Sequence, residues 1–374
     1  MLYNILSALR FMPCLSMSRV KKSFFKKGHF IHLRVCNLIF WRKSFLRMND
    51  RIEFIDLAKG ICIIIVICVH CDMNLSFPGL DSMRMPLYFI LSGLFFKTYG
   101  GFKNFIVKKT NKILLPFIFF YLLGYVAFYA IKAVRPEMIQ LTVAQGITDV
   151  FTGRQYFNGP IWFLLALYWT NIIFCIIHLY IKSEWIRVII IGALSAIGVM
   201  LSHNGIELPF LLDVSITAIP FFYFGYLLKK SDILLPNKYD KYLPLYAIGF
   251  YAVAFIIDYF FDLRYYVHYN IIEGNFIIII LLSICSALSV ILLCKWIKRV
   301  PIISYIGRYS IIALCIHNFI NRPVEHILAH TPLASINEGG YFTALFTIAI
   351  TIGCIPICIK FIPYFTAQKE LIKS

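Results

Sequence analysis

The sequence predicts an all-α fold, a polytopic transmembrane bundle of about ten helices. Sixty per cent of the 374 residues are apolar, and the mean hydropathy is +0.79. Charged residues make up 14% of the chain, against about 25% in a soluble domain. Apolar runs approaching the roughly 20 residues that cross a bilayer core recur from end to end. These runs are too uniformly apolar for barrel strands, so we expect helices, which satisfy their own backbone hydrogen bonds in lipid.

The ten expected spans lie at approximately 55–75, 83–99, 113–131, 161–181, 186–201, 212–228, 243–261, 275–294, 302–321 and 341–363. A cytoplasmic N-terminus places 14 Lys or Arg residues in inside loops and 6 in outside loops. The positive-inside rule therefore predicts that both ends of the bundle face the cytoplasm. The second span is the least regular of the ten, because Pro86, Ser92 and Gly93 interrupt it.

The net charge of +18 is concentrated at the N-terminus, where residues 1–47 contain ten Lys or Arg and no acid. Much of the remaining excess of basic residues lies in alternate loops, as the positive-inside rule predicts for a membrane protein, and this argues against a nucleic-acid partner. Residues 1–50 are read either as a basic amphipathic arm on anionic lipid or as an upstream extension, with the native start at Met48. We favour the extension. We expect the membrane domain to span 51–366, followed by a cytoplasmic tail at 367–374.

Three ionisable residues, Asp56, Lys59 and His70, lie in the first expected span, where such groups are costly. Lys59 and His70 are eleven residues apart, so they lie about 16 Å apart along a helix and only about 20° apart around it. One face therefore carries a cation near the cytoplasmic end and an imidazole in mid-membrane. Histidine is the natural general base near neutral pH. The alternative is a histidine that packs against a neighbouring helix.

The eleven cysteines lie mostly inside apolar runs, where small packed thiols are expected. The run Cys68-Val69-His70-Cys71 does not predict a metal site. Its side chains fall within one helical turn and cannot all reach one ion, and no second ligand pair has a matching spacing.

Further candidates lie at the ends of later spans. Lys109 and Lys112, three residues apart at the start of the third span, either hold donor phosphates or anchor the helix at the interface. Trp162 opens the fourth span and either anchors it or stacks on a sugar. Arg308 and His317 lie in the ninth span, about 180° out of phase on a continuous helix, which argues against action on one ligand atom.

Five segments resemble motifs of the acyltransferase-3 membrane O-acyltransferases of bacteria, especially the fucose 4-O-acetylase-like branch. The resemblance runs from about Arg51 to residue 363. Its segments are Asp56 through His70, Met85-Pro-Leu-Tyr-Phe-Ile-Leu-Ser-Gly93, Lys109 with Lys112 before Leu115-Pro116, Gly159-Pro-Ile-Trp-Phe-Leu164, and Gly307 through His317. The chain departs from the usual pattern in having Lys at 59, 109 and 112 where Arg is common, and Lys lacks the bidentate fork of Arg.

The resemblance implies a multi-pass protein of the bacterial cytoplasmic membrane that moves an acyl group, commonly acetyl, from acyl-CoA to a sugar hydroxyl. Acetyl-CoA is then a co-substrate, with no permanently bound cofactor. The acceptor is a surface polysaccharide or its lipid-linked precursor. We expect His70 and Lys59 to be catalytic, with His70 either deprotonating the acceptor or briefly carrying the acyl group and Lys59 orienting or electrostatically supporting the site. Donor contacts are expected from Lys109, Lys112, Ser92 and Arg308, and acceptor contacts from Trp162 and His317.

Two other functions are compatible with the composition: a transporter or flippase for a lipid-linked glycan, and a non-catalytic scaffold of a glycan-assembly complex. The transporter gives no reason for the shared face of Lys59 and His70, and the scaffold predicts that His70 can be changed freely. The oligomeric state, the sugar and the hydroxyl that is modified are left open.

Overall fold

The computed structural model describes residues 52–373 apart from 74, 76, 135–147, 150, 154–157, 232, 262, 334–336 and 338. The expectations for residues 1–50 fall outside the described residues, and so do Arg135 and Arg154, two of the six basic residues counted in the outside loops. Residues Ile52–Ser374 cluster into one unit. Within the described part of the chain the fold is helical, except for one two-stranded hairpin.

The α-helices occur along the chain as α3 (Glu53–His70), α4 (Arg84–Leu94), α5 (Phe102–Lys109), α6 (Leu115–Val134), α8 (Trp162–Tyr180), α9 (Glu184–His203), α10 (Leu212–Thr217), α11 (Ile219–Lys230), α12 (Leu243–Phe260), α13 (Phe276–Ile297), α14 (Pro301–Arg308), α15 (Ser310–Ala329) and α16 (Tyr341–Phe361). A π-helical turn, Thr110–Leu114, joins α5 to α6. The strands are β1 (Arg264–Tyr266) and β2 (Ile271–Glu273), paired antiparallel.

Six helices of the described chain are long and apolar enough to cross a membrane, and two bent pairs raise the number to eight. These segments coincide with the last eight of the ten expected spans. The first two expected spans correspond to α3 and α4. Helix α3 carries three charges in 18 residues, and α4 has 11 residues, which at 1.5 Å per residue cover about half of a bilayer core.

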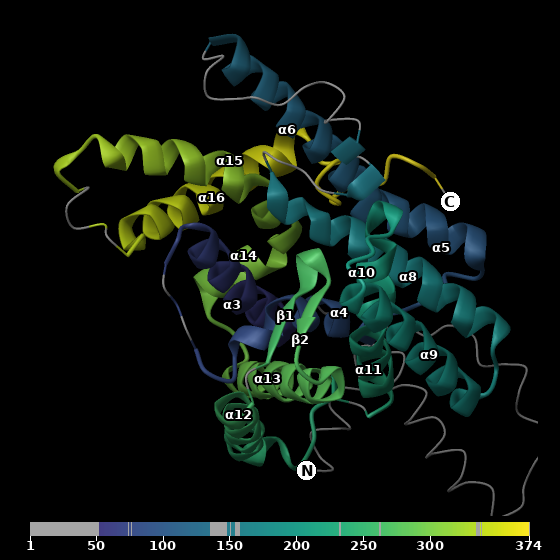
Figure 1. Ribbon diagram of the computed structural model, residues 1–374. Coiled ribbons are helices and arrows are strands. Elements are labelled where there is room, and N and C mark those ends of the chain that lie inside the picture. The colour runs from purple at the N-terminus through teal and green to yellow at the C-terminus, as the bar shows by residue number, and fades with distance from the viewer. Residues whose placement is uncertain are drawn as a thin grey trace, which may run out of the picture. The chain divides into compact units, whose positions relative to one another are not determined.

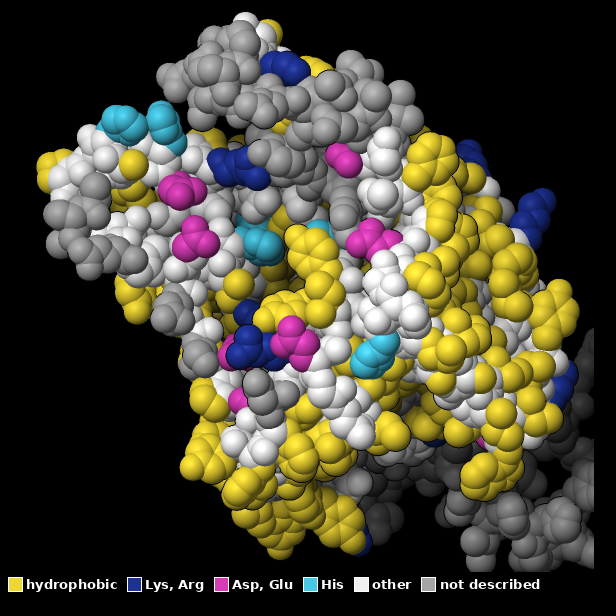
Figure 2. All heavy atoms as spheres, in the orientation of Figure 1, with side chains coloured by type: hydrophobic (Ala, Val, Ile, Leu, Met, Phe, Trp, Pro, Cys, Tyr) yellow, Lys and Arg dark blue, Asp and Glu magenta, His cyan; other side chains and the backbone are white. Residues whose placement is uncertain are grey.

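The helices differ in how deeply they are buried (Figure 1). In the most apolar stretch of the α8 span, 78% of the residues are buried, against 17% in the α12 span. Helix α12 packs on α13 and α16 on α15, whereas α3 and α4 lie among several other helices. Figure 2 shows apolar side chains over the outer helices and charged and histidine side chains around a central hollow. The outer faces are typical of lipid contact, and the polar residues of α3 and α4 are kept inside.

Helix α3 packs on α14 with the two backbones in direct contact. A Cβ added at Gly60 would overlap the carbonyl oxygen of Ile303, and one added at Gly307 would overlap that of Asp56. Small residues of this kind permit close helix packing where lipid supplies no hydrophobic driving force. The contact fixes the part of α3 that carries Lys59.

We predict that Gly307→Ala destabilises the protein, because the clash is with a backbone carbonyl that cannot rotate away. Overpacking costs about 1–3 kcal/mol, and the upper end is expected here. The measurement is the melting temperature in detergent. Gly192→Ala is the control, since nothing lies within 4 Å of a Cβ in that helical position. Equal melting temperatures for the two variants would contradict the close-packing account.

Candidate active site

Two cavities lie on either side of a pair of apolar side chains. The first, of about 370 Å³, contains His70, Arg84, Trp162, Arg264 and His268 in its wall and is called here the histidine cavity. The second, of about 290 Å³, contains Lys59, Ser92, Lys109 and Lys112 and is called the lysine cavity. Met85 and Leu314 line both cavities. The two spaces are therefore neighbours separated at that point by two flexible side chains.

One face of α3 lines the two cavities in turn. Lys59 and Ile63 lie in the wall of the lysine cavity, and Val66 and His70 lie in the wall of the histidine cavity. These positions follow the i, i+4, i+7, i+11 spacing of a single helix face. Lys59 and His70 therefore share a face, as their spacing predicts, but each addresses a different cavity.

The lysine cavity is cationic. Lys59, Lys109 and Lys112 line it, and its described lining includes no Asp or Glu. Lys109 is 9% exposed, and its Nζ lies 5.4 Å from the centre of the Phe105 ring. Lys112 is exposed, and Lys59 is half-buried. Cations gathered against apolar walls attract anions such as phosphates.

Asn111 is 1% exposed and lies between Lys109, at the end of α5, and Lys112, in the π-helical turn. Its side chain accepts hydrogen bonds from the backbone N–H groups of Leu371 (2.8 Å) and Ile372 (2.9 Å). It donates to the carbonyls of Val107 (2.9 Å) and Ile372 (2.8 Å). These hydrogen bonds fix residues 371 and 372 against the π-helical turn that positions Lys109 and Lys112. Turns of this type are often found at functional sites.

Ser92 and Gly93 combine a cavity wall with a close helix contact. Ser92 lines the lysine cavity, and its hydroxyl accepts a 3.1 Å hydrogen bond from the side-chain amide of Asn171. A Cβ on Gly93 would overlap the carbonyl oxygen of Phe222 in α11. The Ser-Gly pair therefore allows α4 to approach α11 closely.

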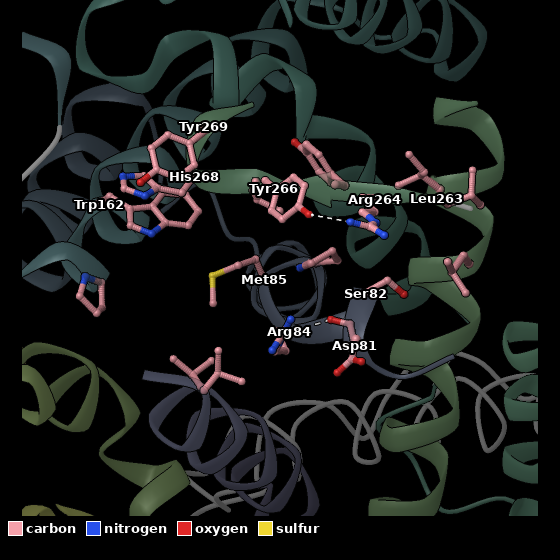
Figure 3. A pocket seen from close by; sticks show the side chains of 18 of the residues that line it. Asp81, Ser82, Arg84, Met85, Trp162, Leu263, Arg264, Tyr266, His268 and Tyr269 are labelled. Atoms are coloured by element: carbon pink, nitrogen blue, oxygen red, sulfur yellow. Dashed lines mark hydrogen bonds between the residues drawn. The ribbon is translucent and has the colours of Figure 1, made fainter. Parts of the chain in front are cut away.

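The wall of the histidine cavity combines aromatic residues with two arginines, Arg84 and Arg264, and two aspartates, Asp81 and Asp258 (Figure 3). The Trp162 ring stacks on His268, with centroids 4.9 Å apart and planes 16° apart. Arg84, at the start of α4, donates from Nε to the Asp81 carbonyl at 3.2 Å and faces the same cavity. His70, at the end of α3, is exposed to it, whereas its neighbours Cys68 and Cys71 are buried.

The hairpin β1–β2 and the turn between its strands supply the wall opposite α4, from Arg264 to Tyr269. Burial, reinforced by the nearby Asp213 carboxylate, raises the pKa of the Tyr265 phenol. The hydroxyl oxygen of Tyr265 is itself buried. The sequence prediction missed this wall, since residues 264–273 were counted only as a loop with one outside charge. Its signal was the density of aromatic residues in a short segment between two apolar runs.

Arg308 and His317 do not lie where a continuous helix would place them, because α14 and α15 meet at a 90° bend. Arg308 is exposed and lines neither cavity, although Ser310 and Ile311, just after the bend, line the lysine cavity. His317 is 0% exposed and also lines neither cavity. Its ring instead lies against His70, with centroids 5.3 Å apart.

One helix face of this membrane bundle thus lines both a cationic cavity and a histidine-bearing cavity. The chain belongs to the acyltransferase-3 family, because the model of that family's acyltransferase domain matches residues 52–361. No curated protein and no solved structure matches the chain. The protein is therefore a multi-pass membrane acyltransferase.

We predict that Asn111→Leu releases the segment around residue 371 from the lysine cavity. The substitution removes the acceptor of two backbone N–H groups in exposed residues, and each hydrogen bond lost contributes about 0.5–1.5 kcal/mol. Cleavage after Glu370 by a glutamate-specific protease should become severalfold faster, as followed by intact-mass spectrometry. Asn104→Leu, at an exposed site on α5, is the control. Wild-type cleavage rates in both variants would show that Asn111 does not hold this segment.

Proposed function

We propose that this acyltransferase moves an acetyl or other short acyl group from acyl-CoA to a sugar hydroxyl of a surface polysaccharide or its lipid-linked precursor. The observation that carries the proposal is the single face of α3 that runs from the lysine cavity to His70. The donor phosphates would bind Lys109 and Lys112. The thioester would meet the acceptor at the boundary formed by Met85 and Leu314. The resemblance to the fucose 4-O-acetylase-like branch favours acetyl and a carbohydrate.

The mechanism follows from the groups on the two sides of that boundary. His70 takes the proton of the acceptor hydroxyl as its oxygen attacks the thioester carbonyl. The C–O bond forms, the C–S bond breaks, and the CoA sulfur leaves with the proton that His70 returns. Arg84 lines the cavity with His70 and offers a cation for the oxyanion of the tetrahedral intermediate. Lys59 supports the site electrostatically from the neighbouring cavity.

The wall of the histidine cavity suits a sugar. The stacked Trp162 and His268 present an aromatic surface, and the exposed guanidinium of Arg264 in the same wall offers hydrogen-bond donors. Rings that combine apolar faces with polar edges are recognised by such surfaces. Trp162 is accordingly proposed as an acceptor contact.

We place the protein in the bacterial cytoplasmic membrane with ten membrane segments, counting α3 and α4, and with both ends of the bundle inside. The distribution of basic residues between the cavities supports this orientation. Lys109 and Lys112 belong to an expected inside loop, whereas Arg84 and Arg264 belong to expected outside loops. Acyl-CoA would thus enter from the cytoplasm and the glycan from the opposite side.

We predict that His70→Ala lowers acyl transfer by about 10²–10⁴-fold, the usual contribution of a general base. The test is mass spectrometry of the surface glycan from a deletion strain complemented with wild type, His70→Ala or His326→Ala. His326 is an exposed histidine on α15 and serves as the control. Wild type and His326→Ala should restore one acyl substituent that His70→Ala does not. An acylation pattern unchanged by the deletion would instead favour the transporter or scaffold.

We predict that Lys109→Met and Lys112→Met each raise the KM for acyl-CoA about tenfold, with kcat changed little. A charge-assisted hydrogen bond to phosphate contributes about 1.5–3 kcal/mol, and each 1.4 kcal/mol is about tenfold in affinity. The measurement is steady-state kinetics with purified protein in lipid nanodiscs. Lys103→Met, on the same helix but outside the cavity, is the control. A KM unchanged in both cavity variants would place the donor elsewhere.

A further inference from the structure

Helix α15 holds the end of α3 at two points one turn apart. The side-chain amide of Asn321 donates a hydrogen bond to the backbone carbonyl of His70. The ring of His317 lies against the ring of His70, with centroids 5.3 Å apart and planes tilted by 43°. Positions 317 and 321 share a helix face. The same face of α15 therefore fixes the backbone of His70 and contacts its imidazole.

The hydrogen bonds of His317 determine which of its nitrogens carries a proton. Its Nδ1 lies 2.9 Å from the carbonyl oxygen of Ala313. A carbonyl can only accept, so Nδ1 is the donor. The ring is 0% exposed, and full burial disfavours a charged imidazolium. The neutral ring therefore has a lone pair on Nε2.

That lone pair has no hydrogen-bond partner among the residues that the structure describes, although the atom is buried. An unsatisfied buried acceptor destabilises a fold, and such groups call for an explanation. The adjoining titratable ring is that of His70. Because His317 lines neither cavity, a direct contact with the acceptor does not explain its polar atom.

We propose that His317 is a positioning residue for His70. Its Nε2 accepts the ring N–H of His70, after a small rotation of that ring or through one bridging water. This hydrogen bond selects the His70 tautomer whose unprotonated nitrogen faces the histidine cavity. The role resembles that of a residue that orients a general base without itself exchanging a proton. The inference rests on the proposed function of His70 as the base.

The test uses His317→Phe, which keeps a ring and removes the acceptor, and His317→Gln, which retains an acceptor near the position of Nε2. We expect kcat to fall about 10–100-fold in the Phe variant, part of the 10²–10⁴-fold of general base catalysis. The Gln variant should recover much of the lost kcat. In both variants, the KM values should stay within about twofold of wild type. His326→Ala is the control on the same helix.

The pH profile of kcat gives a readout that a merely structural role would not move. The groups facing His70 are Arg84 from α4, Asp72 after α3 and His317 from α15. Only His317 is changed in these variants. If the acidic limb of the kcat profile shifts in His317→Phe and returns to its wild-type position in His317→Gln, the hydrogen bond between His317 and His70 is supported. A raised acceptor KM with unchanged kcat would make His317 a substrate contact and overturn the proposal. Wild-type kinetics in the Phe variant would also overturn it.

A second readout does not depend on acyl transfer. Diethyl pyrocarbonate modifies the unprotonated nitrogen of a neutral imidazole, and peptide mass spectrometry reports its rate at His70. The rate should fall severalfold in His317→Phe and recover in His317→Gln. Equal rates in all three proteins would overturn the positioning role even if acyl transfer is confirmed. Absence of acyl transfer with the expected rate changes would instead overturn the proposed function alone.

Discussion

The backbone contact between α3 and α14 at Gly60 and Gly307 is the constraint on which the rest of the site depends. It lets a short helix with three charges sit among apolar helices without a gap. Gly93 in α4 makes the corresponding contact with α11. With both short helices fixed by their backbones, the side chains that face away from these contacts are left to line cavities. Close packing and the polar interior are thus two aspects of one arrangement.

This arrangement separates the tasks of a group transfer along one helix. Lys59 faces a cationic cavity and His70 an aromatic one, and Met85 and Leu314 mark where the two meet. Under the proposed function, a charged donor and a polar acceptor would occupy the two sides of this boundary. Two separate spaces that meet at Met85 and Leu314 fit an acyltransferase better than a continuous transport path.

The sequence predicted much of this, and its failures have physical causes. Helical periodicity predicted that Lys59 and His70 share one helix face, because α3 is regular over all 18 residues. It failed for Arg308 and His317, because a 90° bend separates them. Apolar length predicted the outer helices and located α4, but it extended α4 to residue 99, whereas the helix ends at Leu94. The wall at 264–269 was missed because a hairpin between two spans leaves no periodic signal.

The most direct test of the account is a cryo-electron microscopy structure with a carba analogue of acetyl-CoA, in which a methylene replaces the thioester sulfur. The account predicts phosphate density beside Lys109 and Lys112 and the acyl end between Met85 and Leu314, facing His70. Density for the CoA moiety in the histidine cavity, or an acyl end that points away from His70, would contradict it.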